Sequence, residues 1–211
     1  MIIGIVGNSK NGKVKLSEYF KNNYSFNYFD VDELVSNILN ENSRNYLSEY
    51  TVVNPFNIFT EAQVLSSKTK EPIESILKRI YISKNARVVT PYHKLVGQLI
   101  AISDNKVKRG SVGTGVSQTT RIFEETGIEI LMSDLINQND LTKEKLRELF
   151  EYTRKFLIDN KDKINEDLLK KIISQEDIFY LTNPQNKDYI FNCYSSLVNT
   201  NLLSVINNIN E

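Results

Sequence analysis

The chain has 211 residues, 40% of them hydrophobic, and its 26 basic side chains balance its 26 acidic ones. This length is sufficient for one domain with a sizeable core. A balanced charge provides no basic field to attract nucleic acid or an anionic membrane, so we expect neither partner. The sequence also lacks the pattern of a signal peptide or a membrane-spanning helix, and we expect a soluble, cytoplasmic protein.

Cysteine and histidine, the usual zinc ligands, are scarce in this chain. Cys193 is the only cysteine and His93 the only histidine. This excludes an intramolecular disulfide and any zinc site built from several cysteines or histidines. His93 follows a short β-rich run, where ligands gather, so it is either a ligand or a hydrogen-bonded structural residue.

The first 40 residues have the pattern of a βαβ unit. An apolar strand over residues 1–6 is followed by a glycine-containing turn, a helix from about 12 to 22 and a second strand over 26–32. A strand, a glycine loop, a helix and another strand form the seed of a doubly wound parallel sheet.

Further elements follow from apolar spacing and turn residues. We expect helices over 57–68, 71–83, 120–127, 139–161, 165–174 and 195–209, with Gly127 as a C-cap. Strands are expected over 86–91 and 128–135, and β-like or mixed runs over 177–184 and 188–197. Residues 93–103 fit a helix or a strand, and 104–120 read as a loop.

A candidate phosphate-binding loop lies between the first strand and the first helix. Gly7, Gly12 and Lys13 match Gly-x-x-x-x-Gly-Lys-[Ser/Thr], but Val14 stands where the hydroxyl residue belongs. In such loops the backbone N–H groups surround a phosphate and the lysine contacts it. The candidate nucleotide-binding residues are Gly7, Asn8, Ser9, Lys10, Asn11, Gly12, Lys13 and Val14. The alternative is an ordinary βα turn with Lys13 in solvent.

Two carboxylates close the second strand. Asp30 and Asp32 are two residues apart, so strand alternation places them on one face. In a parallel sheet this end faces the ligand crevice, together with Lys13. One aspartate could accept a hydroxyl proton or hold Mg²⁺ through water, while the other N-caps the next helix.

A second glycine-rich segment lies in the middle of the chain. Residues 105–120 contain Lys108, Arg109, three glycines and several hydroxyl side chains. They are either an anion-binding lid or a flexible surface loop.

The opening resembles that of the dephospho-coenzyme A kinases, within the wider nucleoside monophosphate kinase group. The resemblance covers "GIVGNSKNGKVKLSEYFKNNYSFNYFDVDELV" and rests on Gly7, Gly12, Lys13 and the Asp30-Val-Asp32 triplet. It implies ATP as phosphoryl donor, a nucleotide-like acceptor, Mg²⁺, and a lid arginine at Arg121. Because Val14 lacks a hydroxyl, Mg²⁺ would be held by water, a carboxylate or the nucleotide.

The resulting expectation is a single three-layer α/β P-loop domain, residues 1–211, with a possible lid around 105–145. Its function would be that of a small-molecule kinase in coenzyme A biosynthesis, with Lys13, Asp30, Asp32 and Arg121 as catalytic residues. The alternatives are a catalytically inactive P-loop relative that binds nucleotides or proteins, and an unrelated α/β protein. The oligomeric state stays open.

Overall fold

The computed structural model of the chain describes residues 15, 18–19, 22–23, 45–104, 114–199 and 207–209. The chain divides into two compact units, Met1–Ser43 and Arg44–Glu211. In the first unit the described residues are helical, and the Asn23 amide donates to the Tyr19 carbonyl over 2.9 Å. This agrees with the helix expected over 12–22.

The described strands of the second unit form parallel pairs. β3 (Ile80–Ser83) pairs with β1 (Asn45–Leu47) on one side and with β5 (Asn207–Ile209) on the other. A separate pair joins β2 (Val52–Val53) to β4 (Arg87–Val88). Parallel pairing with helical connections defines a mixed α/β protein, which confirms the coarser part of the expected fold class.

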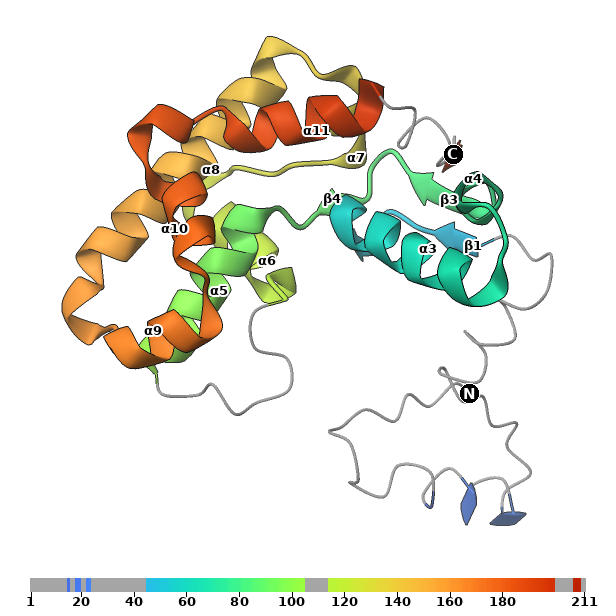
Figure 1. The fold of residues 1–211 in the computed structure, drawn as a ribbon, viewed down its shortest axis with the longest axis horizontal. Helices are drawn as coiled ribbons and strands as arrows, with labels where there is room; N and C mark the ends of the chain where they lie inside the picture. The colour runs from blue at the N-terminus through green and yellow to red at the C-terminus, as the bar shows by residue number, and fades with distance from the viewer. Residues whose placement is uncertain are drawn as a thin grey trace. The chain divides into compact units, whose positions relative to one another are not determined.

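Helices make up most of the remaining structure, as Figure 1 shows. Their bounds are α3 Pro55–Thr69, α4 Ile73–Leu77, α5 Pro91–Ser103, α6 Val116–Thr126, α7 Met132–Asn137, α8 Asp140–Asp159, α9 Glu166–Ile172, α10 Gln175–Thr182 and α11 Tyr189–Asn199. Short 3₁₀ turns occupy Lys161–Lys163 and Pro184–Asn186.

The core of this unit lies where α5 packs against α6, α8 and α9. Its largest fully buried side chains include Tyr92, Phe150 and Tyr194, whose exposed fractions are 0%. The Tyr92 ring meets the edge of Phe150, and Tyr194 stacks on Phe56 of α3. One ring pair therefore joins α5 to α8, and the other joins α3 to α11.

The part of the expected lid that begins at residue 114 contributes to this core. Ile122, Ile130, Met132 and Leu135 are at most 1% exposed. The lid over 105–145 and the single-domain organisation stay predictions.

Several elements differ from their sequence prediction. The helix expected over 71–83 ends at Leu77, and β3 follows because its β-branched residues pair with β1. The strand expected over 128–135 is wrong: Leu131 makes one isolated bridge with Arg87, and α7 begins at Met132. The β-like runs at 177–184 and 188–197 are helical, in α10 and α11. The last predicted helix is wrong at its end, where Asn207–Ile209 is a strand.

Among the described residues, each helix is too short or too polar to cross a lipid bilayer.

Candidate functional site

The residues predicted to bind phosphate lie outside the described residues. Gly7 to Val14, Asp30 and Asp32 belong to this group, and their roles stay predictions. Arg121 is the one predicted catalytic residue whose surroundings are described.

Arg121 lies on α6 and is held by a neighbouring carboxylate. Its Nε is 2.8 Å from Oε1 of Glu125, and both side chains are more than 40% exposed. The Tyr152 hydroxyl of α8 donates to the other carboxylate oxygen of Glu125 over 2.5 Å. Hydrogen bonds from Tyr152 and Arg121 lower the pKa of Glu125, and burial with this bond raises the pKa of Tyr152 to about 12. Arg121 thus joins a surface network between α6 and α8.

The start of α6 rests directly on the first turn of α5. Gly115, the N-cap of α6, has a φ of +81°, a left-handed value that favours glycine. A Cβ at Gly115 would lie 2.7 Å from the backbone nitrogen of Lys94 and 2.9 Å from Cγ1 of Val89. A second close approach joins the Gln118 side chain to Gly97, one turn further along α5. α5 and α6 thus approach closely at two glycines. We call the contact at Gly97 and Gly115 the glycine seat of α6.

The first turn of α5 is fixed by the only histidine. His93 is 2% exposed, and its Nδ1 accepts the backbone N–H of Thr90 over 3.1 Å. Because Nδ1 is an acceptor, the neutral ring carries its proton on Nε2. Burial first, and then the positive charge of Arg87, lower the pKa of His93 to about 4. His93 is therefore a neutral, hydrogen-bonded residue of the helix start.

The N-terminus of α6 has no side-chain cap. Among the described residues, no partner accepts a hydrogen bond from the backbone N–H of Val116 or Ser117. Free N–H groups at a helix start have the polarity that anions prefer.

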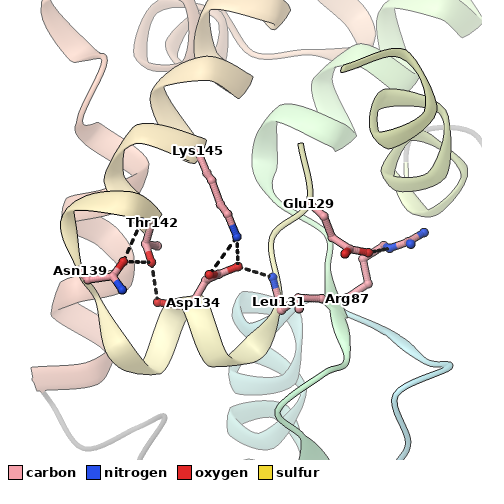
Figure 2. Close-up of polar contacts among 7 residues, drawn as sticks. All are labelled: Arg87, Glu129, Leu131, Asp134, Asn139, Thr142 and Lys145. Carbon is pink, nitrogen blue, oxygen red and sulfur yellow. Dashed lines mark hydrogen bonds and ion pairs between the residues drawn. The ribbon is translucent and has the colours of Figure 1, made fainter. Parts of the chain in front are cut away.

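A polar cluster fixes the segment between α6 and α7 (Figure 2). Nε of Arg87, on β4, is 2.6 Å from Oε1 of Glu129, and its Nη1 donates to the Thr120 hydroxyl over 3.2 Å. The Arg87 guanidinium also lies over the Phe123 ring, 5.4 Å from its centroid. These contacts tie β4 to α6 and to the extended residues before α7.

The junction of α7 and α8 is held by side-chain hydrogen bonds, also drawn in Figure 2. The Asp134 carboxylate accepts the Leu131 N–H over 2.9 Å and pairs with Nζ of Lys145. Asn139 caps α8 by accepting the Thr142 N–H over 2.9 Å, and the Thr142 hydroxyl donates to the Asp134 carbonyl. These hydrogen bonds join side chains to backbone groups at the starts of both helices, so they hold α7 and α8 together at this junction.

A third ion-pair cluster links α8 to the start of α11. Arg147 contacts both carboxylate oxygens of Asp188, at 2.6 and 2.9 Å, and Lys143 lies 3.6 Å away. The Arg147 hydrogen bonds lower the pKa of Asp188. Within the part of the chain that the structure describes, no three histidine, cysteine, aspartate or glutamate side chains gather as metal ligands.

Sequence reasoning missed the glycine seat. Gly97 and Gly115 lie on segments whose contact cannot be seen from spacing, and residues 93–103 fitted either a helix or a strand. The usable signal was the run Thr90-Pro91 before His93, an N-cap followed by a proline in the first helical turn.

Comparison with known proteins sharpens the class of the fold. The parallel strands and packed helices define a mixed α/β protein. A family model described as adenylosuccinate synthetase matches residues 23–192, which is most of the chain. The chain therefore belongs to the adenylosuccinate synthetase family.

Curated relatives with this name agree. The chain is 26% identical over 193 residues to adenylosuccinate synthetase of Chlorobium chlorochromatii, covering 82% of this chain and 43% of the relative. It is 29% identical over 142 residues to that of Clostridium kluyveri, covering 67% of this chain and 29% of the relative. It is 30% identical over 118 residues to that of Pelodictyon phaeoclathratiforme, covering 56% and 26%. The chain thus spans less than half the length of these relatives.

The kinase interpretation is wrong. The family match overturns the resemblance to dephospho-coenzyme A kinases, and with it the ATP-dependent kinase function and the role in coenzyme A biosynthesis. The physical reason is that many unrelated proteins bind phosphate with the same local arrangement. It consists of a strand, a glycine loop with a lysine, and a helix. Such an opening does not specify the reaction, whereas the family match rests on residues 23–192, beyond the loop.

Proposed function

We propose that the chain takes part in GTP-dependent formation of adenylosuccinate. The observation that carries this proposal is the family match over residues 23–192. Adenylosuccinate is an adenine nucleotide whose 6-amino nitrogen carries a succinate unit. The reaction therefore joins the amino group of aspartate to a 6-oxopurine nucleotide, inosine monophosphate, and GTP drives the ligation.

The proposed phosphate site is the loop Gly7–Lys13. Its glycines and the following helix suit a nucleotide phosphate, and Lys13 supplies a positive charge. This proposal replaces ATP by GTP and keeps the three-layer P-loop architecture as its structural basis. Arg121 is proposed as an accessory cation, because its partner Glu125 leaves it on the surface of α6.

We assign the proposed Mg²⁺ ligands to the first unit. The described residues contain no cluster of metal-ligating side chains, and Asp134 and Asp188 are occupied by Lys145 and Arg147. Asp30, Asp32 and the nucleotide phosphates are the proposed oxygen ligands, consistent with the preference of Mg²⁺ for oxygen. The ion would neutralise phosphate charge when bound.

Direct product detection tests this function. The full chain is incubated with inosine monophosphate, aspartate, GTP and Mg²⁺, and adenylosuccinate and GDP are followed by mass spectrometry. We expect both products in equal amounts, and neither when aspartate or GTP is omitted. Absence of adenylosuccinate with all components present would refute the proposal.

A lysine substitution tests the phosphate site separately. Lys13→Ala is expected to abolish turnover, because it removes the positive charge proposed to contact the GTP phosphates. Lys15→Ala, two residues along, is the matched control with an equal change in charge. Equal activity of the two variants would disprove the role of Lys13 while leaving the overall reaction intact.

A further inference from the structure

The start of α5 depends on one ring nitrogen. Thr90 is 0% exposed, and its backbone N–H donates to Nδ1 of His93 over 3.1 Å. The Thr90 hydroxyl lies 2.9 Å from the same nitrogen. Nδ1 therefore fixes the backbone and side chain of the residue that precedes the helix.

Protonation of the ring would reverse this arrangement. A proton on Nδ1 turns the acceptor into a donor, which the Thr90 hydroxyl oxygen can accept by rotating. The Thr90 N–H would then lose its acceptor in a position without access to water, which is unfavourable. The buried charge would also lack a neutralising partner.

The same turn carries the glycine seat. The positions nearest a Cβ at Gly115 are backbone atoms of Lys94 and His93 and the Val89 side chain. A displacement of this turn therefore removes the surface on which α6 begins.

We propose that His93 is an acid-sensitive anchor, whose protonation releases the first turn of α5 together with the start of α6. The device is independent of the proposed ligase activity. It requires only the hydrogen bond to Nδ1, the burial of the ring and the contact with Gly115.

The charge near the ring, like burial, disfavours protonation of His93. Arg87 of β4 is the charged group that acts on His93, and its positive charge opposes a second one on the ring. Because burial and Arg87 depress the pKa of His93 to about 4, the anchor is intact at neutral pH and released as pH falls toward that value.

The experiment measures the titration of His93 and the amide exchange of the starts of α5 and α6. Since His93 is the only histidine, its imidazole carbon-bound protons give one unambiguous NMR titration in the untagged chain. Amide exchange is measured in parallel at the hydrogen-bonded amides of the two segments, Thr90 and Lys94 in residues 90–94 and Gln118 and Thr119 in residues 115–119. The measurements run from pH 7 to pH 4.5 and are corrected for the intrinsic exchange rate. We expect protection in both segments to fall together by roughly 10- to 100-fold across this range.

His93→Gln is the matched variant, because glutamine at this helix position keeps an acceptor for the Thr90 N–H but does not titrate. Its two segments are expected to keep their protection down to pH 4.5. The proposal is overturned if His93→Gln loses protection as the wild type does. A His93 titration near pH 6.5 would overturn it too, as would loss of protection at residues 90–94 alone.

Discussion

The glycine seat of α6 and the junction of α7 with α8 are held by opposite means. At the seat, Gly115 lets the start of α6 approach the backbone of α5, and Gly97 leaves room for the Gln118 side chain. At the junction, Asp134, Asn139 and Thr142 supply side-chain hydrogen bonds to backbone groups. The first contact should therefore be sensitive to added volume, and the second to lost hydrogen bonds.

Gly115→Ala is the largest expected disruption. The new Cβ would lie within 3.0 Å of three atoms, including backbone of α5 that cannot move by a side-chain rotation. Together with the left-handed φ, we expect a loss of about 2–5 kcal/mol in the free energy of unfolding. Urea denaturation measures this difference.

Gly127→Ala is the control at the other end of the same helix. Its φ of +74° imposes a similar backbone strain, but nothing lies within 4 Å of the added Cβ. We expect a loss of about 1 kcal/mol. Equal losses for the two variants would show that the close approach to α5 contributes nothing.

Asp134→Ala should have the next largest effect. It removes the acceptor of the Leu131 N–H and the partner of Lys145, with the Asp134 side chain only 14% exposed. We expect about 1–3 kcal/mol of destabilisation in urea unfolding. Asp134→Asn keeps an acceptor oxygen and should be more stable than Asp134→Ala. If the two variants are equally destabilised, the loss comes from the missing negative charge and not from the hydrogen bond to Leu131.

Asn139→Ala removes the cap of α8. The Asn139 side chain accepts the Thr142 N–H over 2.9 Å, and the expected loss is about 1 kcal/mol. Asn139→Asp keeps the cap and should be close to the wild type in thermal unfolding. A loss in Asn139→Asp as large as that in Asn139→Ala would argue against capping as the cause.

Glu125→Gln is expected to have the smallest effect. The Arg121 and Glu125 side chains are 46% and 43% exposed, and solvent screens such pairs. We expect about 0.3–0.5 kcal/mol, with Glu124→Gln as a neighbouring control. A loss above 1 kcal/mol would assign Tyr152 and Arg121 a larger structural role than an exposed pair usually has.

The sequence predicts the helices with strong local signals. α3 and α8 have regular apolar spacing, and Gly127 ends α6 in the left-handed conformation, as expected of a C-cap. The failures come from short segments rich in aromatic and β-branched residues. In α10, Ser174 caps the first turn and Leu181 enters the core, so tertiary packing overrides the β-like composition.

The candidate site is less predictable for a different reason. The contact of Gly115 with the first turn of α5 depends on how two helices pack, which no local pattern encodes. The error in the reaction class has a similar origin, because the pattern of Gly7, Gly12 and Lys13 predicts a phosphate site and carries no information about the acceptor. Family membership rests instead on the 23–192 match.

A competition between the two reactions tests the central claim most directly. The full chain is given GTP and ATP together with inosine monophosphate, aspartate and dephospho-coenzyme A, in the presence of Mg²⁺, and the products are separated by mass. The proposed function predicts adenylosuccinate with release of GDP, and no coenzyme A. Coenzyme A with release of ADP, and no adenylosuccinate, would contradict the account.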